Sequence, residues 1–199
     1  MKTKISLLVI TLFASAILFT SCSKDNDQPI SVPIPIQEQN PLPGYLAASG
    51  FDQTTIVTTN VLNFEIGFSF MPLVNGKITA IVLKIPEGQT NAIRVTIWDK
   101  AQQSIVRTEN IVYTTADVEV IKTITPIDLV SGREYVISMN SNDYYIRKRT
   151  NGANVTYPFT TGDFKITSYN ESGSSTQTFP PPNVNFAYVG DCSFKFQKS

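Results

Sequence analysis

The chain of 199 residues contains no histidine, and it has only two cysteines and one tryptophan. Without histidine it lacks the most common general base and the usual partner of a thiol nucleophile. It also lacks a glycine-rich phosphate loop, a nucleophile elbow and a cluster of metal-ligating residues. We therefore predict that the protein is not an enzyme and that it needs no cofactor and no metal ion.

Neither sign of charge dominates the chain, which has 16 basic and 16 acidic side chains. A chain close to neutral does not attract nucleic acid electrostatically, so we expect no nucleic-acid partner. Long apolar runs are also missing, with one exception near the start. There, Lys2 and Lys4 precede an apolar run over residues 5–19, which is too short to span a bilayer stably. This order predicts a secretory signal peptide over residues 1–21.

The signal segment ends in residues 18–22, Leu-Phe-Thr-Ser-Cys, which resemble the lipobox of bacterial lipoproteins. In those proteins the cysteine thiol is diacylated, the signal is removed before it, and the new amino terminus is acylated with a chain such as palmitate. The resemblance implies that Cys22 is lipidated and that it anchors the mature chain in a membrane. The alternative is an unmodified cysteine at the end of an ordinary signal peptide.

The residues that follow Cys22 indicate where the mature protein is located. Residues 23–27, Ser-Lys-Asp-Asn-Asp, resemble the lysine-then-acid signal that sends some Gram-negative lipoproteins to the outer face of the outer membrane. The resemblance implies a surface-exposed outer-membrane lipoprotein, and the start of a solvated linker is the alternative. Five prolines within residues 28–45 favour extended polyproline II backbone. We therefore predict a lipidated, proline-rich linker over residues 22–45 and one domain over residues 46–199.

From about residue 46, short runs of Val, Ile, Thr, Phe and Tyr alternate with Gly, Asn, Asp and Pro, and no helical period is visible. The clearest strand covers residues 62–70, where every even position is large and apolar, so we expect one buried face and one wet or lightly covered face. Further strands are expected at 78–85, 92–98, 105–113, 118–124, 134–139, 144–148, 164–169, 184–188 and 193–197. Roughly eight or nine strands at this spacing predict an all-β, antiparallel β-sandwich that is jelly-roll-like.

One turn has the residues of a sandwich corner. Leu129, Gly132 and Tyr135 stand at the spacing at which a strand begins after a corner, and there the tyrosine hydroxyl bonds to backbone. We therefore expect Tyr135 to pack beneath the turn and to bond to it.

The order of several short motifs is similar to that of a known family. The motifs are Ile-Gly-Phe-Ser-Phe at 66–70, Asn-Gly-Lys-Ile-Thr-Ala-Ile at 75–81, Val-Thr-Ile-Trp-Asp at 95–99, Leu-Val-Ser-Gly-Arg-Glu-Tyr-Val-Ile at 129–137, and Gly-Asp-Phe-Lys-Ile at 162–166. Residues 50–197 resemble domain of unknown function 4082, a family of secreted bacterial β-sandwich modules. Its members are often joined to extracellular enzymes or adhesins, so the resemblance implies an accessory or binding role. The resemblance implies no catalytic residue, because none is known for the family.

The polar segment over residues 140–162 is the best sequence candidate for a recognition surface. It contains Tyr144, Tyr145 and Tyr157, together with Asp143 and Arg147. Loops at the end of a sandwich often bind ligands, aromatic faces suit sugar rings, and charged or amide groups suit hydroxyls. We expect these residues to bind a glycan or another extracellular polymer. The alternative is that the basic residues of 147–149 form a solvated edge that discourages strand addition.

For Trp98 and for Cys192, the sequence allows a buried structural position as well as an exposed functional one. Trp98 alternates onto the face of Arg94 and Thr96, where it could stack on a sugar ring, but we favour a role in covering the second side of the sheet. Cys192 shares a strand face with Phe194, so we expect a buried thiol rather than a reactive one.

Calcium binding and glycan hydrolysis are two further functions that would need oxygen ligands or a pair of carboxylates. Asn140, Asn142 and Asp143 offer oxygen atoms for calcium, but they match no known calcium loop, and ordinary turn chemistry explains them better. Glycan hydrolysis would need a pair of carboxylates, such as Asp143 with Asp163 or Glu171. Nothing in the sequence places such a pair together.

These observations predict a lipid-anchored module of the cell envelope that binds a glycan or another polymer through loops at the end of a β-sandwich. The alternative is a structural or adhesive subunit of a surface assembly, whose partner is an envelope protein. A carboxylate-dependent glycan hydrolase is a third and less favoured interpretation.

Overall fold

A computed structural model describes residues 37–58, 62–88, 91–183 and 186–199. All of them belong to one unit, Ile36–Ser199. The predicted signal peptide, the lipidation site Cys22, the export signal at Lys24-Asp25 and the first part of the predicted linker lie outside the described residues. Within the described ranges, none of the helical structure is long and apolar enough to cross a membrane.

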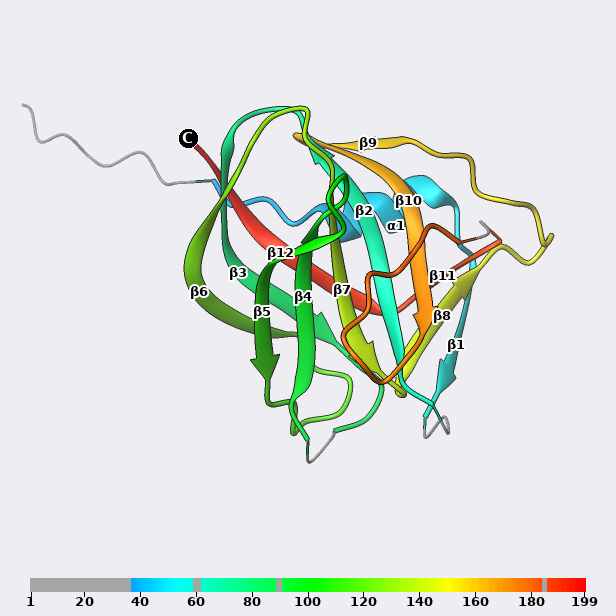
Figure 1. The fold of residues 1–199 in the computed structure, drawn as a ribbon. Coiled ribbons are helices and arrows are strands. Elements are labelled where there is room, and N and C mark those ends of the chain that lie inside the picture. Colours follow the sequence, from blue (N-terminus) through cyan, green and yellow to red (C-terminus); the bar gives the residue numbers. More distant parts are fainter. Residues whose placement is uncertain (1–36, 59–61, 89–90, 184–185) are drawn as a thin grey trace, which may run out of the picture. The chain divides into compact units, whose positions relative to one another are not determined.

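The domain is built from antiparallel strands in three sheets. The largest sheet has the order β5-β4-β7-β2-β10-β9, and the other two have the orders β12-β3-β6 and β1-β8-β11. The strands are β1 (Gln53–Val57), β2 (Phe64–Pro72), β3 (Gly76–Lys84), β4 (Ile93–Asp99), β5 (Ser104–Ile111), β6 (Val120–Leu129), β7 (Tyr135–Ser141), β8 (Tyr144–Lys148), β9 (Phe159–Thr161), β10 (Phe164–Gly173), β11 (Ala187–Val189) and β12 (Asp191–Lys198). In Figure 1 the strands β3 and β12 lie behind β4 and β7, and side chains from both sheets form one core.

The prediction of an all-β antiparallel sandwich is confirmed. The described residues form 12 strands. Each of the ten expected ranges overlaps one of them, and β1 and β9 were not predicted. β9 has only 3 residues. The sequence of β1, Gln-Thr-Thr-Ile-Val, does not alternate between apolar and polar side chains, and four of its five side chains are exposed. Neither strand therefore carries the periodic signal on which sequence interpretation depends.

The chain is packed earlier than the predicted boundary at residue 46. Helix α1 (Pro41–Ser49) is capped at its N-terminus by Asn40, whose side chain accepts a hydrogen bond from the Leu42 N–H at 3.1 Å. The ring of Tyr45 within this helix is 0% exposed. The linker prediction is therefore wrong for residues 37–45, because proline is favourable in the first turn of a helix as well as in extended backbone. An asparagine cap decides between the two conformations here.

Tyr45 joins α1 to the aromatic core. Its ring centroid lies 5.1 Å from that of Tyr188, 6.0 Å from that of Phe68 and 5.9 Å from that of Phe159. These rings come from β11, β2 and β9, so one side chain contacts strands of two different sheets. Such contacts between aromatic rings stabilise beyond the area that they bury.

The second face of the six-stranded sheet is covered by residues 174–183, which we call the strap. The Asn170 side-chain amide donates to the Pro180 carbonyl at 2.9 Å, and the Gln177 side-chain amide donates to Thr96 Oγ1 at 2.9 Å. The expectation of a wet or lightly covered face on the strand at 62–70 is therefore wrong. Its polar side chains Glu65 and Ser69 are buried.

The corner predicted at Tyr135 is present. Its hydroxyl accepts a hydrogen bond from the Val130 N–H at 3.2 Å, and its ring is buried. Tyr113 makes a similar corner that the sequence did not indicate. Its hydroxyl lies 2.9 Å from the Ile85 carbonyl and 2.6 Å from the Val118 carbonyl, and it accepts from the Val118 N–H at 3.0 Å.

Two tyrosine hydroxyls test how much these corners contribute to stability. Tyr113→Phe removes a hydroxyl that bonds backbone on both sides of a turn, so we expect a loss of about 1–3 kcal/mol in the free energy of unfolding. Tyr188→Phe is the matched control, because the buried Tyr188 hydroxyl has no hydrogen-bond partner within the described residues. We expect this control to be neutral or stabilising. Urea denaturation of both variants measures the difference, and equal losses would contradict it.

A second variant tests whether residues 37–45 belong to the fold. Tyr45→Ala removes a fully buried ring, so we expect a loss of about 3–5 kcal/mol in urea denaturation. Ala47→Ser changes an exposed position of the same helix, and it should alter stability by about 0.5 kcal/mol or less. If the two variants unfold at the same urea concentration, residues up to 45 act as the linker that the sequence predicted.

Candidate functional site

The structure separates the residues that the sequence grouped as a recognition surface. Trp98 is 3% exposed, its indole N–H donates to Ser138 Oγ at 2.9 Å, and its ring meets that of Phe179 edge-on. It covers the second side of the sheet, as in the interpretation that we favoured, so its ring is closed to a ligand. The strap, which carries Phe179, explains why a tryptophan on a polar face is nevertheless buried.

Tyr144 and Asp143 point into the domain rather than toward solvent. The Tyr144 ring packs edge-on against Phe64, with ring centroids 6.0 Å apart. Asp143 is buried, and its Oδ2 atom accepts a hydrogen bond from the Glu87 N–H at 2.9 Å. Neither residue is a ligand contact in this conformation, because both complete the packing of the turn between β7 and β8.

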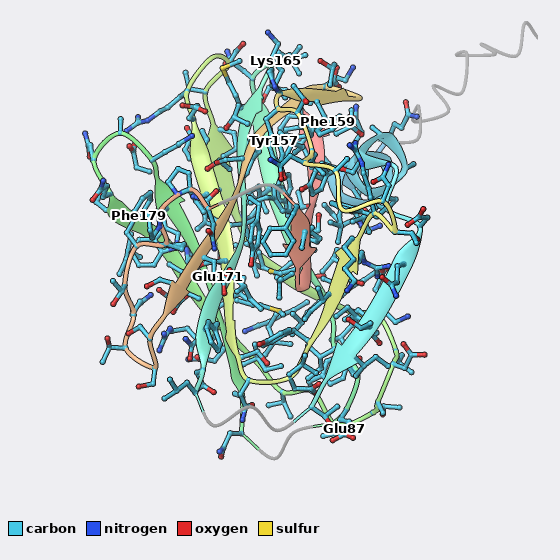
Figure 2. All side chains as sticks on the ribbon, turned by 90° about the vertical axis from the view of Figure 1, so that its right-hand side faces the viewer. Glu87, Tyr157, Phe159, Lys165, Glu171 and Phe179 are labelled. Carbon is cyan, nitrogen blue, oxygen red and sulfur yellow. The ribbon has the colours of Figure 1, made fainter. Side chains whose placement is uncertain are left out.

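Tyr157 is half-buried beside α1. Its hydroxyl shares a hydrogen bond with the hydroxyl of Tyr45. Burial raises the pKa of Tyr157 to about 12, so its hydroxyl stays protonated at neutral pH. Figure 2 shows Tyr157 and Phe159 close together, and their ring centroids are 5.5 Å apart. Tyr157 therefore supports the helix and does not form an aromatic platform.

Tyr145 and Arg147 are brought together on β8, in a cluster that we define as Lys84, Asp117, Tyr145, Arg147 and Asp191. Arg147 Nε donates to Asp191 Oδ1 at 3.0 Å, and the second guanidinium nitrogen donates to Asp191 Oδ2. Lys84 Nζ lies 2.8 Å from Asp117 Oδ1, and the Tyr145 hydroxyl donates to the same carboxylate. Lys84 Nζ and Arg147 Cζ each lie 5.5 Å from the centroid of the Tyr145 ring.

The charges in this cluster compensate one another. Burial raises the pKa of Asp191, and the Arg147 guanidinium opposes that shift. The two guanidinium nitrogens of Arg147 satisfy the buried Asp191 carboxylate with charge-assisted hydrogen bonds. Beside it lies a small pocket of about 160 Å³. Its lining is Asn40, Leu42, Pro43, Leu46, Val82, Lys84, Glu119 and Asp191.

A larger hollow lies where the start of α1 meets the turn between β9 and β10 and the end of β12. Its volume is about 580 Å³, within the range of about 300–1,000 Å³ that is usual for ligand sites. The small pocket falls below that range. The lining of the hollow consists of Gln37, Gln39, Asn40, Pro41, Gly44, Thr161, Gly162, Asp163 and Lys198. Sequence interpretation missed this site because its residues come from three distant parts of the chain.

The polar groups of the hollow hold one another in place. Gln39 Oε1 accepts from the Asp163 N–H at 3.1 Å, and the Gln39 amide nitrogen donates to the Asp163 carboxylate. Lys198 Nζ lies 2.7 Å from Asp163 Oδ2. The hydrogen bond and ion pair with Lys198 hold the pKa of Asp163 below its ordinary value. Asp163 is therefore ionised at neutral pH and acts as a hydrogen-bond acceptor.

Two glycines line the hollow at positions where a Cβ atom would clash with a neighbouring side chain. Gly162 has a φ of 53°, and a Cβ at this position would lie 2.4 Å from Gln39 Oε1. A Cβ at Gly44 would lie 2.0 Å from Thr161 Oγ1. The two glycines thus let the helix and the turn approach closely, and they position Thr161 and Gln39 at the hollow.

The oxygen ligands and carboxylates that the sequence singled out do not form one site. Asp163 lines the hollow, and Glu171 accepts hydrogen bonds from Tyr169 at 2.8 Å and from Asn183 at 2.7 Å. Asp143 contacts Glu87, which Figure 2 places at the opposite end of the domain from Lys165, a close neighbour of Asp163 in the chain. Across the described ranges, no group of three or more His, Cys, Asp or Glu could hold a metal ion.

Residues 52–187 match a domain of unknown function, DUF4082, so the chain belongs to that family. No curated protein matches the chain. The match includes Thr161, Gly162 and Asp163, but it excludes residues 37–44 and Lys198. The hollow is therefore built partly from the family domain and partly from residues that flank it.

The charged cluster makes a prediction about stability and its pH dependence. Arg147→Met leaves Asp191 buried without its guanidinium partner, so we expect a loss of about 3–5 kcal/mol at neutral pH. The folded state then binds the Asp191 proton more tightly than the unfolded chain does. Stability must fall as pH rises from the ordinary value of 3.8 through the raised pKa. The variant should therefore regain part of its lost stability when the pH is lowered toward about 4.

The control for this variant is Lys77→Met, which breaks an exposed ion pair with Asp128. We expect this control to change the free energy of unfolding by about 0–1 kcal/mol. Urea denaturation at neutral and acidic pH compares the two variants. If Arg147→Met becomes less stable on mild acidification, the assigned direction of the Asp191 shift is incorrect.

Proposed function

We propose that this protein is a lipid-anchored module of the outer membrane that binds a glycan or a similar hydroxyl-rich polymer without altering it. The observation that carries the proposal is the polar hollow of about 580 Å³ between α1, the turn between β9 and β10, and the end of β12. The predicted lipidation at Cys22 and the export signal at Lys24-Asp25 support a location in the envelope. Membership of a family whose members are often joined to extracellular proteins agrees with this role.

The lining of the hollow suits hydroxyl groups. Side-chain amides supply both donors and acceptors, Thr161 supplies a hydroxyl, and the pair of Asp163 and Lys198 supplies an acceptor beside a donor. A ligand that both donates and accepts at short intervals matches this lining, as the hydroxyls of a sugar do. No aromatic ring is among the described lining residues. Recognition would therefore depend on hydrogen bonds rather than on stacking.

The state of Asp163 supports binding without catalysis. A general acid in glycoside hydrolysis has a raised pKa and faces a second carboxylate. The pKa of Asp163 is instead lowered by Lys198. An ionised, paired carboxylate orients a ligand hydroxyl but donates no proton to it.

A second candidate function is that of a structural or adhesive subunit of a surface assembly. The observation that favours it is the uncharged outer strand β1, whose side chains are largely exposed. An assembly would use strand β1, whereas glycan binding would use the hollow. Each function can therefore be tested independently of the other.

Glycan retention tests the first proposal. The full chain in detergent micelles is mixed with insoluble peptidoglycan, chitin, cellulose or mannan, and the bound fraction is measured after sedimentation. We expect wild type to be retained by at least one of them. The double variant Gln37→Ala and Lys198→Met removes one polar group from each of two sides of the hollow, and it should bind about tenfold more weakly. Lys77→Met with Gln102→Ala removes the same two residue types from other exposed positions, and it should bind as wild type does.

The pH dependence of retention is a further readout. Because its lowered pKa keeps the Asp163 carboxyl ionised, we expect constant retention between about pH 5 and about pH 8. Retention should decline only as the pH falls below the ordinary value of 3.8 for the Asp163 carboxyl, since its pKa is lowered. Failure of wild type to bind any of the four polymers would overturn the proposal. So would equal binding by the hollow variant and its control.

A further inference from the structure

Strand β1 forms the outer edge of the three-stranded sheet β1-β8-β11. Figure 1 shows it at the margin of the fold with β8 on one side. The side chains from Gln53 to Ile56 are exposed, and that of Ile56 is 58% exposed. An exposed edge presents a row of backbone donors and acceptors that another strand can satisfy.

The pairing within the sheet shows which backbone groups of β1 point outward. The Gly190 N–H donates to the Tyr145 carbonyl at 2.9 Å, so the peptide groups of Tyr145 face β11. Backbone groups alternate in direction along an antiparallel strand, so those of Ile146 face β1. Ile146 stands opposite Thr55 in the register of β1 and β8.

Thr55 therefore uses its backbone groups inside the sheet, toward β8. By the same alternation, the N–H and C=O groups of Thr54 and Ile56 point away from the sheet. These two residues also have β-branched side chains, which favour the extended conformation that a further strand would require.

The other outer strands are protected against pairing. β5 carries Arg107 and Glu109, and β6 contains Pro126. β9 and β11 have 3 residues each. The edge of β12 is occupied by Gln39, which exchanges two backbone hydrogen bonds of 2.9 Å with Phe196. Charge, proline, short length and a covering segment are the usual devices that prevent edge-to-edge association.

Among the residues that the structure describes, β1 has none of these devices over Gln53–Val57. Its sequence, Gln-Thr-Thr-Ile-Val, contains no charge and no proline, and its pairing with β8 is regular. In the described part of the chain, the other outer strands are protected and β1 alone presents an uncharged, open edge, which indicates that this edge has a partner. The absence of charge also bears on the identity of that partner.

The strand is complementary to a second copy of itself. In an antiparallel pair related by a two-fold axis at Thr55, the outward groups of Thr54 face those of Ile56 in the other copy, and the reverse contact is identical. Such an isologous contact is the commonest way in which identical chains associate. Opposed β-branched side chains stabilise the pair, whereas like charges across the axis would oppose it. β1 has no charge to place there.

We propose that the protein forms a two-fold symmetric dimer in which β1 pairs with β1 of a second copy. The two sheets β11-β8-β1 then become one continuous sheet across the axis. This proposal does not depend on glycan binding, because the hollow is lined by other elements.

Cysteine cross-linking in intact cells tests the geometry. Residues at a two-fold axis in a non-hydrogen-bonded pair have Cα atoms about 4.5 Å apart, which suits a disulfide. The full chain with Thr55→Cys should therefore form a covalent homodimer under mild oxidation with oxidised glutathione. Thr123→Cys is the matched control, because it lies at an exposed position of another outer strand, β6. The native Cys192 is buried and should not interfere.

We expect the dimer fraction of Thr55→Cys on non-reducing gels to exceed that of Thr123→Cys by about tenfold. Adding Ile56→Pro to Thr55→Cys removes an outward N–H that β8 does not use, so it should abolish the dimer while the domain stays folded. Near-ultraviolet circular dichroism of Trp98 reports on folding. Equal cross-linking of the two single variants would overturn the proposal. A mixed disulfide with a different protein in place of the homodimer would also overturn it.

Discussion

The contact of Tyr45 with the aromatic core is the interaction on which one end of the domain depends. The ring meets Phe68 and Tyr188, which belong to different sheets, and its hydroxyl bonds to that of Tyr157. This contact holds α1 against the sandwich. The start of α1 in turn lines both the hollow and the small pocket beside the charged cluster, and Asn40 is shared by the two. The positions of both sites therefore follow from the burial of one side chain.

The face of the six-stranded sheet that the strap covers is held together by polar contacts. Glu65 is buried there with Arg94 as its partner, and Ser138 Oγ donates to Glu65 Oε2 at 3.0 Å. Burial raises the pKa of Glu65, and the hydrogen bond and charge of Arg94 oppose that shift. A buried ion pair adds little net stability, but removal of one partner is costly. The strap thus covers a face whose buried side chains are held by specific hydrogen bonds, whereas aromatic rings pack against one another on the other face.

Sequence patterns predicted the parts of the fold that local alternation controls, and they missed the parts that depend on distant contacts. Most of the longer strands and the corner at Tyr135 were anticipated because each has its own periodic or turn signal. α1 was missed because its prolines also suit an extended linker. Tyr145 was expected on a recognition surface, yet it is buried and its hydroxyl donates to Asp117. Trp98 covers the second side of the sheet as we favoured, but the strap that buries it was not anticipated. Asp163 was considered only as half of a carboxylate pair, since nothing local connects it to Gln39 or Lys198.

The division of the hollow between two parts of the chain limits what family membership implies about function. The family match ends at residue 187 and begins at residue 52, so the amides from α1 and its approach, and the ammonium group of Lys198, lie outside it. A relative can share the sandwich and the turn at Gly162 and still lack the groups opposite them. β1, in contrast, lies inside the match. Relatives are therefore expected to share the open edge of β1 more often than the full lining of the hollow, because the edge is part of the common domain and the hollow is completed by residues that flank it.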